Sequence, residues 1–154
     1  MPAPPRHLFV YGTLRPALAS GESRRLIHGL HVTGNATVPG RLYDLGEYPG
    51  LTAGDGLVHG DVLEIDQPER LTALDAYEEC GGPQPLFYRE QAVATFPDGQ
   101  CLPVWIYRYG QSIKTARLLP HGDYARQGKA APGLMASNSQ ETQIDLEGNP
   151  RKTG

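Results

Sequence analysis

The sequence is poor in the features that mark several large classes of protein. It has two cysteines, Cys80 and Cys101, and one tryptophan among its 154 residues. Two thiols cannot build a disulfide framework and no Cys-x-x-Cys pair is present, so we expect a reduced, cytoplasmic protein in which Cys80 is inert. No apolar run is long enough to cross a bilayer, and the Pro-rich N-terminus lacks a signal-peptide core, so we expect no membrane partner.

Charge and motif content exclude further classes of function. The net charge is −3 and the Lys and Arg residues form no basic run, which argues against nucleic acid as a partner. The sequence lacks the Gly-x-Ser-x-Gly elbow of hydrolases, a P-loop and a His-Glu-x-x-His zinc motif. His28 and His31 have no carboxylate near them at metal-binding spacing. We therefore expect neither a metal site nor a cofactor.

The residues that are abundant point to strands and turns. Gly (19), Pro (14) and Tyr (8) suit short strands joined by tight turns within one domain. We expect strands at 8–11, 36–43, 57–65, 88–96 and 101–109, a loop at 45–56, and helices at 20–30, 66–79 and 112–119. Because this order is no regular βαβ alternation, it predicts an α+β fold, a small mixed β-barrel with flanking helices. We expect this domain to span 1–127 and a flexible tail to span 128–154.

One helix predicted from the sequence carries a glutamate on its apolar face. At 100° per residue, Leu71, Leu74 and Glu78 fall in one narrow sector. Burial, the negative end of the helix dipole and the charges of Asp75 and Glu79 would together raise the pKa of this carboxyl group. A glutamate with a raised pKa is what a general base near neutral pH requires. The alternative is a helix that frays early and leaves Glu78 in solvent.

A second candidate feature is the loop formed by Tyr11, Gly12, Thr13 and Leu14. Gly12 directly follows a buried strand and would let the backbone approach a ligand closely. Successive backbone N–H groups turned out of the strand can bind a carboxylate or a developing oxyanion. The same residues also fit an ordinary turn at the end of a strand.

Several segments, taken in order, resemble the γ-glutamylcyclotransferase-like superfamily, which includes the AIG2-like proteins, the bacterial YtfP-type proteins and γ-glutamylamine cyclotransferase. These segments are Phe9–Arg15, Gly40–Gly46, Tyr48–Leu51, Val58–Asp61, Leu74–Glu78, Tyr88–Arg89 and Trp105–Tyr107. The resemblance covers the chain from about Leu8 to Tyr124, and the tail after Gly128 lies outside it.

The resemblance implies a small mixed barrel with a polar cavity and a cyclisation reaction. In that reaction the α-amine of a small γ-glutamyl substrate attacks its own γ-carbonyl, which releases an amine and 5-oxoproline. The family's catalytic glutamate falls on Glu78, and its substrate-holding loop falls on Tyr11–Leu14. Tyr88 could line the cavity, although a tyrosine in a strand equally often packs in the core. The leaving amine stays open.

The sequence departs from the family pattern at several positions, and these departures are consistent with other functions. Relatives often have Gly after the catalytic glutamate, where this sequence has Glu79, and an insertion at Cys80–Leu86 follows. Near Tyr124 a Gly-Asp-Trp pattern has Tyr in place of Trp. One alternative is therefore a binding module that holds a small carboxylate metabolite without turnover, and another is a partner-binding protein that uses the tail. A Glu78 side chain in bulk solvent would weaken the enzyme hypothesis.

Overall fold

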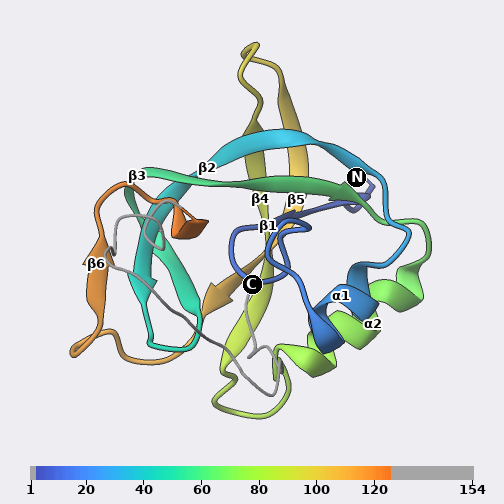
Figure 1. The fold of residues 1–154 in the computed structure, drawn as a ribbon. Coiled ribbons are helices and arrows are strands. Elements are labelled where there is room, and N and C mark those ends of the chain that lie inside the picture. The colour runs from blue at the N-terminus through green and yellow to red at the C-terminus, as the bar shows by residue number, and fades with distance from the viewer. Residues whose placement is uncertain (1–2, 126–154) are drawn as a thin grey trace.

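The computed structural model describes residues 3–125, so the predicted tail at 128–154 lies outside the described residues. The six strands and two helices of the described part are β1 (His7–Val10), α1 (Gly21–Ile27), β2 (Val32–Asp44), β3 (Pro49–Glu64), α2 (Pro68–Tyr77), β4 (Phe87–Thr95), β5 (Cys101–Tyr109) and β6 (Arg117–Leu119). Figure 1 shows the long strands β2 and β3 crossing the molecule together, with the β4–β5 hairpin extending beyond them.

Five of the strands close into a barrel. β1 pairs with β3, β3 with β2, β2 with β4, β4 with β5, and β5 again with β1. The β1–β5 and β3–β5 pairs are parallel and the other pairs are antiparallel, so the barrel is mixed. β6 adds to the end of β2 without taking part in the closure. This arrangement confirms the predicted fold class.

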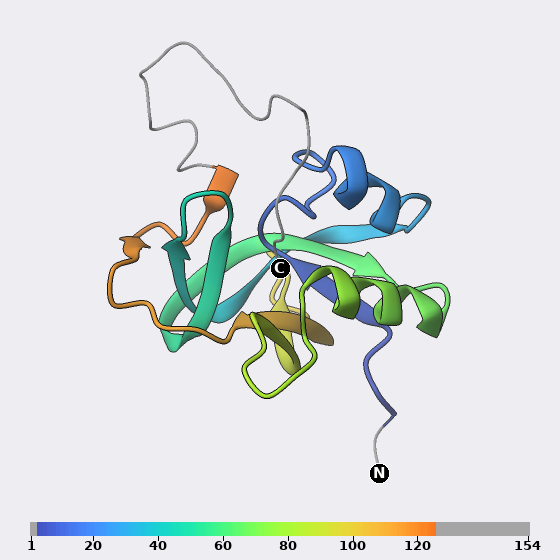
Figure 2. The same ribbon diagram turned by 90° about the horizontal axis from the view of Figure 1, so that it is seen from below.

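The side chains of β1 alternate between two cores. Phe9 and Tyr11 lie in the barrel interior, whereas Leu8 and Val10 pack in a second core that includes Leu74 of α2. Both helices lie on one flank of the barrel (Figures 1 and 2), where they contact each other. The end of β1 therefore lies between the barrel interior and the layer under the helices.

The prediction of a loop over 45–56 is wrong, because β3 begins at Pro49 and continues through the rest of this segment. Leu42 of β2 pairs with Leu51 of β3, and the antiparallel ladder extends to Asp44 and Pro49. Position 50 has no room for a larger residue than glycine, because a Cβ there would lie 2.8 Å from Leu45 Cδ1 and 2.9 Å from Tyr109 Cβ. The glycine that locally suggests a loop is instead required by close packing in a strand.

The helix predicted at 112–119 is also wrong. Residues Arg117–Leu119 form β6, which pairs with Leu42–Asp44 of β2. The helix predicted at 66–79 exists but is shorter, since α2 begins at Pro68 and ends at Tyr77. Asp66 precedes the helix and forms an ion pair with Arg70, at 3.1 Å.

Candidate active site

The buried phenol of Tyr11 ties the end of β1 to two other strands. Tyr11 Oη donates a hydrogen bond of 2.5 Å to the carbonyl of Tyr107 on β5 and accepts one of 3.3 Å from the N–H of Leu51 on β3. Burial, followed by the negative charge of Glu78, raises the pKa of Tyr11 well above its ordinary value. Tyr11 is therefore a neutral hydrogen-bonding group that fixes the point at which the candidate loop begins.

The chain turns immediately after Tyr11. Gly12 and Leu14 are buried and Thr13 is half-buried, and the carbonyl of Gly12 accepts a 2.9 Å hydrogen bond from the N–H of Arg15. Leu14 packs in the core beneath the helices. The four predicted loop residues thus form a tight turn between the barrel and α2.

Arg15 anchors the far end of this loop. Its guanidinium forms ion pairs with Asp61 of β3, at 3.1 Å, and with Asp123, at 3.2 Å. Asp61 also accepts a 2.5 Å hydrogen bond from the side-chain amide of Asn35. The sequence alone does not predict a role for Asp61 or Asn35, because neither stands in a local pattern that indicates a contact across the barrel.

Glu78 follows the last helical residue of α2. Its N–H donates to the carbonyl of Leu74 at 2.9 Å, and its side chain is fully buried, as is that of Leu74. The predicted inward direction of Glu78 is therefore observed. The early end of the helix, which the alternative prediction required, is also observed, but it does not expose the carboxylate to solvent.

The charge of Glu78 contributes to raised pKa values at three other side chains, those of Tyr48, Tyr107 and Cys80. Burial and then nearby negative charges, Glu78 among them, raise the pKa of Tyr48, and burial with the Asp75 contact and the Glu78 charge raises that of Tyr107. Burial, Asp75 and Glu78 raise the pKa of Cys80 to about 12. Cys80 is therefore a thiol rather than a thiolate near neutral pH, as the sequence analysis expected.

A polar network centred on Asp75, three residues before Glu78, holds α2 against the sheet. Asp75 accepts a 2.7 Å hydrogen bond from Tyr107 Oη and two from Arg89, at 2.8 and 3.1 Å. The guanidinium of Arg89 in turn lies over the ring of Trp105, 4.3 Å from its centroid. Since the carbonyl of Tyr107 also accepts the hydrogen bond from Tyr11, one residue of β5 contacts both halves of the candidate site.

Tyr88 lies on a different face of β4 from the residues that contact α2. On β4, Phe87 and Arg89 face α2, and Tyr88 alternates to the other face with its side chain 42% exposed. Leu14 of the loop packs in the same core as Leu74 of α2, and burial, followed by the charge of Glu78, raises the pKa of Tyr11. Tyr88 lies on the other side of the sheet from α2. Its role in lining a cavity stays a prediction.

Two structural features are absent from residues 3–125. Within that range no three His, Cys, Asp or Glu side chains are grouped so that they could hold a metal ion. Neither α1 nor α2 is long and apolar enough to cross a membrane.

Comparison with known proteins places the chain in one family. The family pattern described as "Gamma-glutamyl cyclotransferase, AIG2-like" matches residues 8–126. A Vibrio cholerae relative is 38% identical over 126 residues, which are 79% of this chain and 98% of the relative. The Escherichia coli K12 "Gamma-glutamylcyclotransferase family protein YtfP" is 34% identical over 123 residues, with the same two coverages, 79% and 98%.

A solved structure supports the same assignment at the level of the fold. The AIG2-like protein of Mus musculus superposes with a TM-score of 0.67 over 88% of this chain and 97% of its own, at 22% identity. The chain belongs to the γ-glutamyl cyclotransferase, AIG2-like family. Membership in this family supports an enzyme of γ-glutamylcyclotransferase-like function.

Proposed function

We propose that this protein converts a γ-glutamyl amine, amino acid or peptide into 5-oxoproline and a free amine, with Glu78 as the general acid and base. The observation that carries the proposal is the full burial of the Glu78 side chain. Burial and then the negative charge of Glu78 raise the pKa of Tyr11, at the start of the Tyr11–Leu14 loop. A solvated Glu78 would have argued for a binding module without turnover.

The reaction needs one group that takes a proton and later returns it. The α-ammonium of the γ-glutamyl group loses a proton to Glu78, and the resulting amine nitrogen attacks the γ-carbonyl carbon. Glu78 returns this proton to the leaving nitrogen, and the bond from the carbon to that nitrogen breaks. The ring nitrogen, which still carries two protons, then gives one through Glu78 to the released amine, so the products are the lactam N–H of 5-oxoproline and an ammonium ion. No water is consumed, so atoms and charge balance between one substrate and two products. Burial away from water disfavours the charged form of a carboxyl group and so raises its pKa. A carboxylate with a raised pKa is a stronger base toward an ammonium ion.

The Tyr11–Leu14 loop is proposed to hold the substrate. Backbone N–H groups in such a turn can bind a carboxylate or the oxyanion that develops on the γ-carbonyl. The hydrogen bonds of Tyr11 and the ion pairs of Arg15 fix both ends of the loop before substrate arrives. Such preorganisation favours ring closure, because an intramolecular attack gains most of its acceleration from a correctly folded substrate.

Product identification tests the reaction class. The full chain is incubated with γ-glutamyl amines, γ-glutamyl amino acids and glutathione, and with a matched conjugate whose α-amine is acetylated. We expect 5-oxoproline from at least one free-amine conjugate and no release of amine from its acetylated form, since acetylation removes the nucleophile. Release of N-acetylglutamate would show hydrolysis by water and contradict the proposal. Binding of conjugates without any product would favour the non-catalytic binding module.

A further inference from the structure

Two carboxylates stand within one helical turn of each other at the end of α2. The N–H of Glu78 donates to the carbonyl of Leu74 at 2.9 Å, so helical spacing continues to Glu78 although α2 ends at Tyr77. Residues three positions apart on a helix are neighbours, with Cβ atoms about 5–6 Å apart, and Asp75 stands at that spacing from Glu78. Two negative charges this close disfavour each other. A base at Glu78 is therefore favoured by a positive charge that offsets Asp75.

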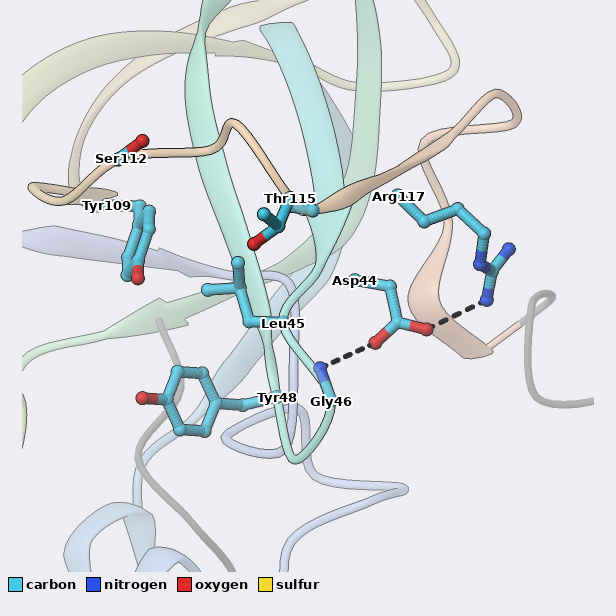
Figure 3. A pocket seen from close by; sticks show the side chains of 9 residues that line it. Asp44, Leu45, Gly46, Tyr48, Tyr109, Ser112, Thr115 and Arg117 are labelled. Carbon is cyan, nitrogen blue, oxygen red and sulfur yellow. Dashed lines mark hydrogen bonds and ion pairs between the residues drawn. The ribbon is translucent and has the colours of Figure 1, made fainter.

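The side of the β4–β5 hairpin that faces α2 is a ladder of three cross-strand pairs, namely Phe87 with Tyr109, Arg89 with Tyr107, and Gln91 with Trp105. The first pair borders an open pocket of about 410 Å³, one side of which is formed by Tyr109 and Tyr48 (Figure 3). The second pair lies two residues further along the strands, about 7 Å away. Both side chains of the second pair contact Asp75, so α2 meets the hairpin at Arg89 and Tyr107.

The guanidinium of Arg89 is held on two sides. It donates two hydrogen bonds to Asp75, at 2.8 and 3.1 Å, and lies over the ring of Trp105, 4.3 Å from its centroid. The indole N–H of Trp105 donates to the carbonyl of Pro5 at 3.0 Å, which fixes the ring. The side chains of Arg89 and Asp75 are 24% and 31% exposed, so solvent screens this ion pair only in part. Arg89 therefore offsets the charge of Asp75 beside Glu78.

The half-buried thiol of Cys80 lies within reach of the same charges. Its N–H donates to the carbonyl of Asp75 at 3.1 Å, so the turn that contains Glu78 is closed onto Asp75. Burial, followed by the charges of Asp75 and Glu78, raises the pKa of Cys80 to about 12, and the charge and backbone of Arg89 act in the opposite direction. Cys80 can therefore report the balance between Asp75 and Arg89 without any substrate.

The phenols near Glu78 are uncharged at neutral pH. They are those of Tyr11, Tyr48 and Tyr107, whose pKa values are raised, first by burial and also by the charge of Glu78. Glu79, the next residue, is exposed, so solvent screens its carboxylate. The charge of Arg108 acts on Tyr11, and Arg108 is itself paired with Glu90.

We infer that Arg89 is a positioning residue for the proposed reaction and acts through Asp75: it offsets the Asp75 charge, so that Glu78 can stay ionised and take the substrate proton. The inference rests on the proposed function. Tyr107 holds the same carboxylate through a hydrogen bond of 2.7 Å from a neutral phenol, so it attaches α2 but cannot offset a charge. Arg89 therefore supplies the charge, and Tyr107 keeps the helix attached when that charge is removed.

Two substitutions should move the pH profile in opposite directions. The acidic limb of kcat/KM against pH reports the ionisation of Glu78 in the free protein, because Glu78 must be a carboxylate to accept the proton. Arg89→Met leaves Asp75 charged beside Glu78, so the limb should move to higher pH, by about half a unit to one unit. Asp75→Asn leaves the Arg89 charge, so the limb should move to lower pH. The double variant, which lacks both charges, should return close to the wild-type limb, and Arg89→Lys, which keeps the charge, should stay there.

The Cys80 thiol tests the same charges independently of activity. In a Cys101→Ser background, its rate with iodoacetamide at roughly pH 9 should fall about three- to tenfold in Arg89→Met, since half a unit to one unit of pKa changes the thiolate fraction by that factor. The rate should rise in Asp75→Asn. A merely structural role for Arg89 predicts the opposite sign for Arg89→Met, because a loosened helix exposes the thiol.

Arg70→Met is the matched control. Arg70 pairs with Asp66 at 3.1 Å at the other end of α2, so its loss should change neither the acidic limb nor the thiol rate. Circular dichroism should show each variant folded. If Arg89→Met does not fold, Asp75→Asn decides: a limb at lower pH supports the inference, and an unmoved limb overturns it.

The possible outcomes separate this inference from the proposed function. An acidic limb that Arg89→Met leaves in place or moves to lower pH overturns the role of Arg89 and leaves the proposed function standing, as does a faster reaction of Cys80 in that variant. A double variant that keeps the shift of Arg89→Met shows that the effect does not run through Asp75, and overturns the inference as well. Absence of 5-oxoproline from every γ-glutamyl compound overturns the proposed function, and the inference with it.

Discussion

Tyr11 and Tyr107 are joined by a 2.5 Å hydrogen bond from the phenol of the first to the carbonyl of the second. The phenol of Tyr107 donates in turn to Asp75, three residues before Glu78. Tyr107 thus connects the strand that leads into the proposed substrate loop to the helix that precedes the proposed catalytic carboxylate. The distance between the two halves of the site is set by β5, a central strand of the barrel.

Tyr11→Phe should destabilise the protein by about 1–3 kcal/mol, because the buried N–H of Leu51 loses its acceptor and the carbonyl of Tyr107 loses a donor. Urea denaturation measures the free energy of unfolding. Tyr88→Phe is the matched control, since Tyr88 is exposed, and should change stability by less than about 0.5 kcal/mol. Equal stability of the two variants would contradict the contacts described for Tyr11.

Tyr107→Phe should reduce kcat for 5-oxoproline formation more than it raises KM. The substitution removes the 2.7 Å hydrogen bond to Asp75, so the end of α2 is held less firmly. The loop that we propose to bind substrate keeps its hydrogen bond to the Tyr107 carbonyl. Steady-state kinetics and a thermal unfolding curve are measured on the same preparation. A change in KM alone would argue against a role for Tyr107 in positioning Glu78.

Arg15→Ala should cost about 2–4 kcal/mol of stability, because it leaves the largely buried carboxylate of Asp61 without its ion pair. Arg25→Ala breaks an exposed pair with Glu22, whose side chains are 73% and 52% exposed, and should cost under about 1 kcal/mol. Chemical denaturation of both variants in one buffer makes the comparison. A loss for Arg15→Ala no greater than that for Arg25→Ala would show that the loop is not anchored through Asp61.

Glu79→Gly should stabilise the protein, by about 1 kcal/mol, since glycine adopts φ = 57° without strain. For a chain of this size that gain raises the melting temperature by about 2–4 °C. Glu79→Gln keeps the Cβ and should show no such gain. If the two variants melt at the same temperature, Glu79 is not strained.

Cys80 should react with iodoacetamide far more slowly than Cys101. Burial, with the charges of Asp75 and Glu78, raises the pKa of Cys80 to about 12, whereas Cys101 is exposed. At pH 8 the rate for Cys80 in a Cys101→Ser variant should be at least about thirtyfold below that for Cys101 in a Cys80→Ser variant. The rate for Cys80 should rise roughly tenfold per pH unit up to about pH 12, because the thiolate fraction of Cys80 increases. Similar native-state rates for both thiols would contradict the burial of Cys80.

Local signals in the sequence predict much of the fold. The apolar run of β1, the Pro-initiated helix α2 and the turn residues between β4 and β5 each determine their own structure, and the predictions there agree with the structure. The failures share one physical cause. The first part of β3 and all of β6 owe their strand conformation to hydrogen bonds with β2, a partner that no local pattern reveals.

The candidate site divides in the same way. Helical periodicity alone predicts that Glu78 points inward, and the structure shows it buried. The contact between Tyr107 and Asp75 joins residues 32 positions apart, so it follows from the closure of the barrel and not from spacing. The sequence predicts the end of α2 two residues too late, because the glycines at 81 and 82 give a strong stop signal, whereas the left-handed residue is Glu79 and the helix ends at Tyr77.

The most direct test of the central claim compares 5-oxoproline release by wild-type protein and Glu78→Gln across the γ-glutamyl panel. Glutamine keeps the shape of the side chain and cannot accept the proton, so kcat should fall at least about a hundredfold. Glu69→Gln should retain full activity, and circular dichroism should show all three proteins folded. Turnover by folded Glu78→Gln at a rate close to wild type would contradict Glu78 as the general acid and base.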